Sequence, residues 1–431
     1  MGETPVRRRR YLAALGTVAS GGLAGCSLSP GTSDATNETT NSSQSDDFPS
    51  EPVQPQREFP ALTADEPTFR NWVPGTGKQR DPFTVAFNIA RIRDQKAELP
   101  AETYERLASW AMFGGYVGME YEEMEGVLFA LGSGIVVYTG SVTESTIRSR
   151  LDATSYEQFD QRQGITYYRA SDSEDADLLG VGEEGIVYGS AEHDAERIGQ
   201  PFIEKTVPLF ETVRGDRSRL HEEPDLYEEY TDSVGWPLMT YVRLPQFRDP
   251  DRRYNPQLIP ADDQMPDEMV AAMRPGYAQY LADDSVVDLH WLWIAEGMDI
   301  TPAEVREGYR TAWIRSQFDE RRLAVRTEGQ VVKVALSEPI ETPGEGIDPP
   351  IVSMAISIES ETAILEHRLG DPVDLERLIL WVDGERISTG SGRLSPGESV
   401  RIDISAAEER DEANVVYEFP TGGTVQVAET D

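Results

Sequence analysis

The strongest constraint on the fold is one order of predicted elements, strand-helix-strand-helix-strand-strand, that occurs twice between residues 67 and 340. In the first copy, hydrophobic periodicity predicts strands at 83–92, 127–139, 165–169 and 185–188 and helices at 100–112 and 142–151. In the second copy it predicts strands at 236–244, 286–294, 322–326 and 330–336 and helices at 266–280 and 302–314. A repeated element order indicates two similar modules.

Local matches support this duplication. The run Gln-Phe-Asp-Gln-Arg at 158–162 corresponds to Gln-Phe-Asp-Glu-Arg at 317–321. Thr143 and Thr301 each suit the N-cap of a following helix, and Glu304 would complete a capping box with Thr301. We therefore predict an α+β protein with a duplicated ferredoxin-like antiparallel module, its helices on one face of each sheet. Residues 67–230 form copy 1 and residues 231–340 form copy 2, and a helical segment at 191–213, interrupted at two prolines, bridges them.

A different pattern follows residue 340. Residues 341–350 are rich in proline and glycine and read as a linker. Residues 351–431 contain short strands and turns only, which predicts a small C-terminal antiparallel β-sandwich. Its strands are expected at 351–359, 363–368, 378–382, 399–404, 415–419 and 424–428.

Part of this C-terminal region resembles a known family. The run His-Arg-Leu-Gly-Asp-Pro-Val-Asp-Leu at 367–375, the strand at 378–382 and Ser-Pro-Gly-Glu-Ser-Val at 395–400 are similar to the β-sandwich domain of haloarchaeal type IV pilins. The pilin N-terminal assembly helix is absent and a lipobox stands in its place. The resemblance therefore implies a surface β-sandwich whose edges contact partners. The preceding region loosely resembles haloarchaeal surface lipoproteins of unknown function.

The N-terminus carries an export pattern. Arg8, Arg9, Tyr11 and Leu12 fit the twin-arginine motif, and Leu23, Ala24 and Gly25 before Cys26 fit a lipobox. The apolar stretch between them is too short to span a bilayer. We expect cleavage of the signal peptide 1–25, lipidation of Cys26 and anchoring on the outer face of the cell membrane after export in the folded state.

Residues 26–66 are predicted to be a disordered tether, because polar and small residues dominate the segment. Asn37 and Asn41 begin N-glycosylation sequons within it. No cysteine other than Cys26 is present, so neither intrachain disulfides nor thiolate zinc sites are expected.

The charge of the chain indicates its environment. It has 77 acidic and 39 basic residues, and removing four arginines and one glutamate with the signal peptide takes the net charge from -38 to about -41. Only four of the basic residues are lysines. Molar salt shortens the Debye length to about 3 Å and screens such repulsion, so the composition favours a halophilic archaeon. Nucleic acid is an unsuitable partner for so acidic a chain.

No catalytic, cofactor-binding or metal-binding motif is predicted. Gly180 to Gly185 fits a dinucleotide fingerprint, but a strand follows where a helix should begin, so we interpret it as a turn. The four histidines are scattered, and the acidic clusters read as solvated loops. Trp291 and Trp293 lie two residues apart in a strand that also carries His290. We interpret that strand as core, with a glycan platform formed by the two tryptophans as the alternative.

The sequence thus predicts a non-enzymatic, lipid-anchored surface protein that contacts envelope proteins or glycans. Two rivals remain. One is the solute-binding lipoprotein of a transporter, and the other is an extracellular hydrolase that uses a pair of carboxylates. The sequence does not predict an oligomeric state.

Overall fold

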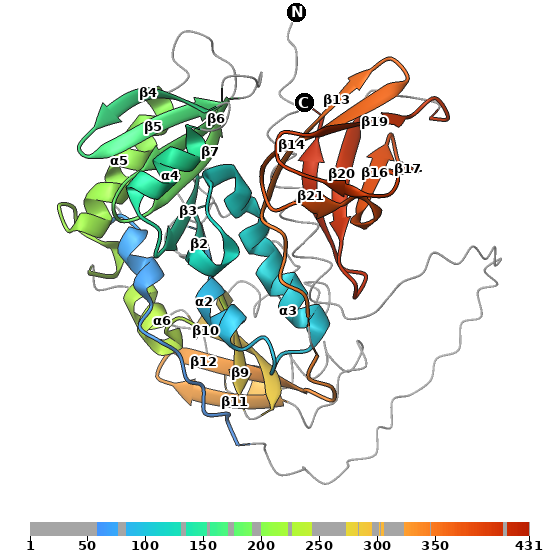
Figure 1. Cartoon of the computed structure of the whole chain (residues 1–431). Helices are drawn as coiled ribbons and strands as arrows, with labels where there is room; N and C mark the ends of the chain where they lie inside the picture. The colour runs from blue at the N-terminus through green and yellow to red at the C-terminus, as the bar shows by residue number, and fades with distance from the viewer. Residues whose placement is uncertain are drawn as a thin grey trace, which may run out of the picture.

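The computed structural model describes most of the chain after residue 57. The described residues are 58–75, 83–130, 135–152, 156–170, 176–191, 200–222, 226–243, 273–282, 284–294, 301, 303–305, 323–344, 346–407 and 412–430. They form a body built on one large sheet and a smaller β-sandwich beside it (Figure 1).

A single antiparallel sheet organises the body. Its twelve described strands lie in the order β11-β12-β10-β9-β8-β1-β2-β3-β7-β6-β5-β4. Their bounds are β1 Phe83–Phe87, β2 Met124–Ala130, β3 Ile135–Gly140, β4 Tyr156–Arg162, β5 Ile165–Ala170, β6 Ala176–Val181, β7 Ile186–Ala191, β8 Met239–Arg243, β9 Met273–Ala282, β10 Ser285–Ile294, β11 Leu323–Glu328 and β12 Val331–Pro339. β1 and β8 meet at the centre, with Val85 opposite Tyr241, and join the two predicted modules into one sheet.

Helices cover both faces of this sheet. On one face lie η1 (Thr68–Trp72), α5 (Gln200–Arg214) and α6 (Leu226–Val234), and on the other lie α2 (Ile89–Asp94), α3 (Ala101–Ala108), the 3-10 helix η2 (Ser109–Val117) and α4 (Glu144–Leu151). Strand residues alternate between the two cores: Ile135 and Val137 enter the first, and Val136 and Tyr138 enter the second. The prediction of helices on one face is therefore wrong, because the strands are apolar on both sides.

The strand order also differs from the predicted ferredoxin-like arrangement. A split β-α-β unit keeps the strands on either side of its helix parallel and separated by another strand. Here β1 and β2 flank α2 and α3, yet they are antiparallel neighbours, with Val85 opposite Phe129. The α+β class with antiparallel sheets is confirmed, while this finer topology is not the one observed.

Most predicted strands are present, and the main error lies at β9. A helix was predicted at 266–280, but Met273–Ala282 is a strand that pairs with β8 and β10. Pro275 and Gly276 disfavour a helix. Pro275 lies opposite Leu292 of β10, one residue beyond the end of the pairing between β9 and β8 at Gly276. Gly276 makes room for a ring, because a Cβ there would lie 2.0 Å from Cε2 of Tyr230.

Smaller errors lie at element ends. The predicted strand 83–92 is β1 followed by α2, whose N-cap Asn88 accepts a hydrogen bond from the Arg91 N–H. The predicted strand 127–139 is the pair β2 and β3. The strands β4 and β6 were missed, and α5 continues through Pro208. The N-cap predictions are confirmed: Thr143 caps α4 and Thr301 exchanges capping-box bonds with Glu304.

The folded part begins earlier than predicted. Asp65 forms a β-bridge with Trp236, and Arg91 donates hydrogen bonds to the Thr63 carbonyl and the Asp65 carboxylate. Residues 58–66, assigned above to the tether, therefore lie against the body. A β-bridge and hydrogen bonds from Arg91 hold the backbone of this segment. Composition alone does not reveal such contacts with distant residues.

The C-terminal region is a β-sandwich, as predicted. One sheet has the order β13-β14-β19 and the other β17-β16-β20-β21, with β15 and β18 paired between them. The bounds are β13 Val352–Glu359, β14 Thr362–Gly370, β15 Val373–Asp374, β16 Leu378–Val382, β17 Glu385–Ser388, β18 Arg393–Leu394, β19 Ser399–Asp403, β20 Ala413–Glu418 and β21 Thr424–Glu429. A shared apolar core fills the space between the sheets.

Candidate functional site

Most of the predicted site residues lie outside the described part of the chain. These are the export-signal residues Arg8, Arg9, Tyr11 and Leu12, the lipobox with Leu23, Ala24, Gly25 and Cys26, and the sequon residues Asn37 and Asn41. Among the described helices, none is long and apolar enough to cross a membrane. Export, lipidation and glycosylation therefore remain predictions.

The structure buries one of the two tryptophans of the alternative glycan platform and leaves the other half-buried. Trp291 is 4% exposed and its ring packs edge-on against Tyr230 at 5.4 Å between centroids. Trp293 is half-buried and packs against the same core. A sugar needs an open ring face, so Trp291 cannot serve as a platform, and the interpretation of β10 as a core strand is confirmed.

His290 belongs to a polar cluster on the opposite face of β10. Tyr277 Oη donates to Asp288 Oδ1 at 2.6 Å, and Gln279 Nε2 donates to the same oxygen at 2.8 Å. Arg106 of α3 reaches the Gln279 amide oxygen at 3.5 Å. Burial lowers the pKa of His290 to about 4, although Asp288 opposes the shift. His290 is therefore neutral near pH 7, and the cluster joins β9, β10 and α3.

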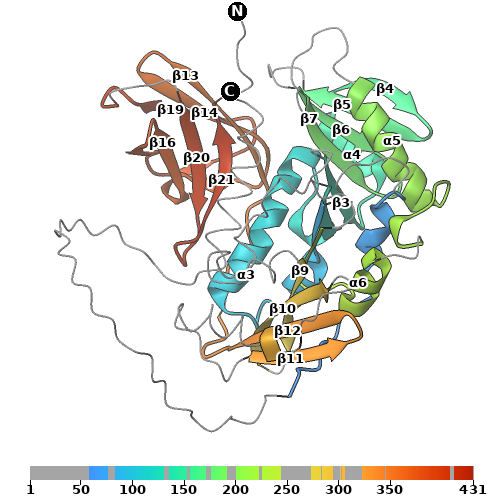
Figure 2. The same cartoon turned by 180° about the vertical axis from the view of Figure 1, so that it is seen from behind.

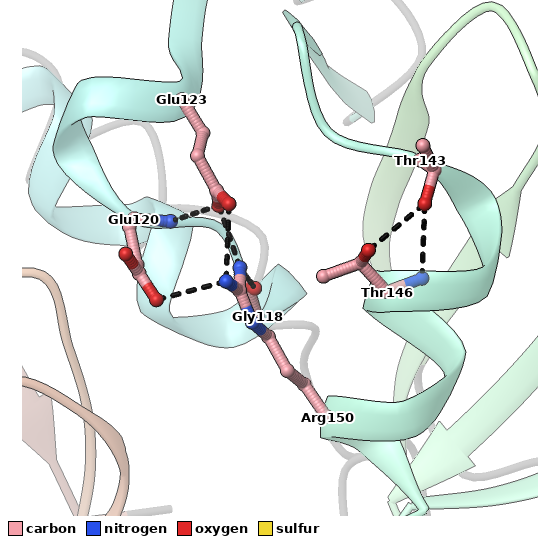
Figure 3. A network of polar contacts seen from close by, with 6 residues as sticks. All are labelled: Gly118, Glu120, Glu123, Thr143, Thr146 and Arg150. Atoms are coloured by element: carbon pink, nitrogen blue, oxygen red, sulfur yellow. Dashed lines mark hydrogen bonds and ion pairs between the residues drawn. The ribbon is translucent and has the colours of Figure 1, made fainter.

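A second polar group clamps α4 to the chain that enters β2 (Figure 3). The Arg150 guanidinium donates to Glu123 at 2.5 Å, to Glu120 at 2.8 Å and to the Gly118 carbonyl at 2.9 Å. Burial raises the pKa of Glu123, but the Arg150 hydrogen bonds, the Glu120 N–H and the positive charge of Arg150 together bring the pKa below the ordinary 4.5. Each donor and acceptor in this group serves to hold two segments together.

Several residues of the predicted linker, called the strap here (residues 341–350), contact α3 and the turn before it. The Gly344 N–H donates to the Leu99 carbonyl at 3.1 Å, and the Ile347 N–H donates to Glu105 Oε1 at 3.1 Å. Gly346 lies so close to Tyr104 that a Cβ would be 2.6 Å from its ring. Glycine in this segment allows close packing, so the predicted linker is also a packed part of the fold.

Glu105 is the central residue of this junction. It is 2% exposed, and besides Ile347 its carboxylate accepts a hydrogen bond of 2.5 Å from Thr421, in the turn between β20 and β21. One buried carboxylate on α3 therefore binds the strap and the β-sandwich together. A buried charge is tolerated only where hydrogen bonds satisfy it, and here both partners come from the C-terminal region.

Two tyrosines and a lysine extend the junction. Tyr104 Oη donates to Asp348 of the strap and accepts from Tyr121 Oη, the two oxygens being 2.9 Å apart. Lys96 Nζ lies 2.9 Å from the Asp348 carboxylate and 5.3 Å from the centre of the Tyr104 ring. Burial raises the pKa of both tyrosines, which stay protonated. These contacts fix the strap on the α2–α3 hairpin.

Apolar packing continues across the same junction. Met112 of η2 is 1% exposed and belongs to the core of the β-sandwich, whereas Ile351, which opens the sandwich, belongs to a core of the body. The two views show α3 between the sheet and the sandwich (Figures 1 and 2). The sandwich and the body therefore share their cores and form one unit.

The residues that carry the pilin resemblance meet at one corner of the sandwich. The buried His367 donates from Nε2 to the Asp371 carbonyl at 2.7 Å, and its backbone pairs with Gly397 and Glu398. Asp371 accepts a hydrogen bond from the Ile351 N–H at 2.9 Å. Gly370 has φ +100°, and a Cβ there would lie 1.8 Å from the Ile351 carbonyl oxygen. The residues of the pilin-like runs therefore have a structural role, because they hold this corner of the sandwich together.

The outer face of the four-stranded sheet carries a half-buried tryptophan between polar side chains. Leu378, Leu380 and Val382 of β16 point into the core, so Ile379 and Trp381 lie on the outer face. Trp381 is half-buried and is flanked by Arg386 of β17 and Asn414 of β20. Sequence reasoning missed this tryptophan, because five consecutive apolar residues in β16 hide the alternation of its faces.

Comparisons with known proteins identify no family. No protein-family model matches the chain, and no curated protein matches it. Among solved structures, TP0453 ("crystal form I") matches with a TM-score of 0.31 and 12% identity, over 64% of this chain and 92% of that chain. A likeness at this level carries no functional argument.

In the described residues no group of His, Cys, Asp or Glu is arranged to hold a metal ion.

Proposed function

We propose that the protein is a non-enzymatic, lipid-anchored cell-surface module of a halophilic archaeon that contacts envelope proteins or glycans. The N-terminal export pattern with Cys26 supports the location, and the excess of acidic residues supports the hypersaline environment. A polar tether after Cys26 would hold the folded unit away from the membrane.

The observation that carries this proposal is the junction at Glu105. A sandwich hung on a flexible linker would sample many orientations, whereas hydrogen bonds to Glu105 and the shared residue Met112 fix it on the body. Fixing a binding face before contact lowers the entropy lost on association. The geometry therefore favours a rigid mount that presents the β-sandwich to a partner.

The use of the polar groups supports a role without catalysis. Asp288, Arg150 and Glu105 are the charged side chains best placed for chemistry among the described residues, and each holds secondary-structure elements together. Catalytic groups are instead expected to converge on a cleft with one reactive atom left open.

We also propose that the sheet arose by duplication. Its order is matched about the central pair β1 and β8: β1-β2-β3-β7 on one side corresponds to β8-β9-β10-β12 on the other. The capped helix starts at Thr143 and Thr301 lie at equivalent places after β3 and β10. The C-terminal sandwich would be a pilin-like domain added to this duplicated body.

Mild cross-linking on intact cells in native salt, followed by mass spectrometry, tests the function. A strain with Cys26→Ser is the control for anchoring, because loss of the lipid should release the protein from the membrane. A deletion of 350–431 is unsuitable, since it would expose Met112 and remove Ile351 from the body core. Point variants on the outer sandwich face should be used instead.

One dominant surface partner in the anchored strain supports the proposal. A membrane permease as the partner would instead indicate a solute-binding lipoprotein. Turnover of a polysaccharide or peptide library in molar salt, abolished by substitution of one acidic residue, would indicate a hydrolase. Either result would overturn the proposed function.

A further inference from the structure

We infer that the outer face of the β17-β16-β20-β21 sheet binds a carbohydrate, with the indole of Trp381 as the stacking surface for a sugar ring. This inference rests on the proposed surface-binding function and names the ligand class of the sandwich. It places the glycan contact on β16, far along the chain from the tryptophans of β10.

The register of the strands defines the face. In one row Trp381 lies between Arg386 and Asn414, and in the next row Ile379 lies between Ser388 and Val416. Beyond these, Val416 lies opposite Gln426 of β21. Three apolar side chains thus form the centre, and the residues around them carry a guanidinium, two amides and a hydroxyl.

The edge of this face is open to solvent. The Arg386 side chain is 60% exposed, and its guanidinium lies 3.8 Å from the Glu418 carboxylate, which is two strands away on β20. This pair crosses β16 diagonally on the outer face, from beside Trp381 toward the end of the strand at Leu378. Gln426 of β21, at the opposite edge of the sheet, donates to Glu429 at 2.7 Å.

The chemistry of the face matches a pyranose ring. A sugar ring presents C–H groups on its flat sides and hydroxyl groups around its rim. The indole of Trp381 offers a flat apolar surface to the C–H groups. The Asn414 and Gln426 amides, the Arg386 guanidinium and the Glu418 carboxylate supply both donors and acceptors for hydroxyl groups.

A protein partner fits this face less well. A stable protein interface buries about 800 Å² on each side, around an apolar centre. The apolar centre here has three side chains, and Ile379 among them is already only 7% exposed. The surrounding residues carry both signs of charge, so the face suits a neutral ligand with many hydroxyl groups.

The test is binding of the mature chain, with Cys26→Ser, to a panel of neutral tri- to hexasaccharides of glucose, mannose and galactose in molar KCl. Titration calorimetry and the change in tryptophan fluorescence give the affinity. We expect at least one sugar to bind, Trp381→Ala to weaken it at least 10-fold, and Trp381→Phe to weaken it only a few-fold because a ring remains.

Asn414→Ala is the second variant, at a half-buried position that leaves the apolar centre intact, and should weaken binding 3-fold or more. Glu385→Ala, at an exposed site on β17 outside the two central rows, is the matched control and should bind as the parent does. Unfolding midpoints within experimental error of the parent show that each variant is folded.

Absence of binding by every sugar, or equal binding by Trp381→Ala and the parent, would overturn the inference. The cross-linking experiment separates this failure from failure of the proposed function. A surface protein partner captured equally by the parent and Trp381→Ala would leave the surface function intact and refute the carbohydrate site.

Discussion

The pairing of Glu105 with the C-terminal region predicts a measurable coupling between α3 and the turn that follows β20. Glu105→Ala removes a 2% exposed carboxylate and leaves two groups, the Ile347 N–H and the Thr421 hydroxyl, without their acceptor. An unsatisfied buried donor costs about 1–3 kcal/mol. We expect Glu105→Ala to lower the free energy of unfolding by about 4 kcal/mol, the sum of two such losses taken at the middle of that range.

A double-mutant cycle isolates the contact. Thr421→Val removes one of the two donors and should cost about 1 kcal/mol, the usual net value of one hydrogen bond. If the contact exists, the double variant should be more stable than the sum of the two single losses predicts, by about 1 kcal/mol. Glu102→Ala, an exposed carboxylate in the first turn of the same helix, is the control and should change stability by less than 1 kcal/mol.

Urea unfolding in molar KCl, followed by far-UV circular dichroism, measures the parent, the three variants of the cycle and the control. Limited proteolysis adds a local readout, because release of the strap should expose residues 341–350 to cleavage in Glu105→Ala. A loss in Glu105→Ala equal to that in Glu102→Ala, together with zero coupling to Thr421, would refute the reasoning that this carboxylate joins the two parts.

Three further predictions address the shared core, the buried histidine and the sandwich corner. Met112→Ala should lower unfolding stability by about 2–5 kcal/mol and speed hydrogen exchange in β13 and β14, so unchanged exchange in the sandwich would contradict the shared core. The pKa of His290 is about 4 when folded and 6.5 ordinarily, so the unfolded chain takes up the proton first. The free energy of unfolding therefore falls by about 3 kcal/mol as the pH falls from about 6.5 to 4, and His290 causes no such loss above pH 6.5. His290→Gln should abolish that part of the pH dependence, and equal pH profiles for both proteins would argue against it. Gly370→Ala, whose Cβ would meet the Ile351 carbonyl, should destabilise the sandwich by more than 3 kcal/mol, whereas Gly384→Ala, at φ +87° with open space around it, should cost about 1 kcal/mol. Similar melting points for the two glycine variants would contradict this prediction, because they would mean that the backbone around Gly370 moves to accommodate the added Cβ.

Six strands of the sandwich were predictable because each has apolar residues bounded by turn residues, whereas the short or polar strands β15, β17 and β18 were missed. Asp383-Gly384 shows this well: both residues have positive φ in the hairpin between β16 and β17. In the body, Thr143 and Thr301 predicted the starts of their helices, because N-capping is local in sequence. The sequence predicted these features because they depend only on neighbouring residues.

Features that depend on distant partners were missed. Gly276 is explained only by Tyr230, whose ring fills the space beside the glycine, and Pro275 lies just beyond the end of the pairing with β8. Glu105 looked like one more surface acid in an acidic chain, since its partners lie 242 and 316 residues away. Periodicity could not show which apolar residues of β16 face outward.

The most direct test of the account is the distance between the body and the sandwich in solution. Spin labels at Glu102→Cys and Ser388→Cys, in a chain with Cys26→Ser, report that distance by double electron–electron resonance in molar KCl. The account predicts one narrow distance distribution, which broadens when Glu105→Ala is added. A broad distribution in the parent, unchanged by Glu105→Ala, would contradict a rigidly mounted sandwich.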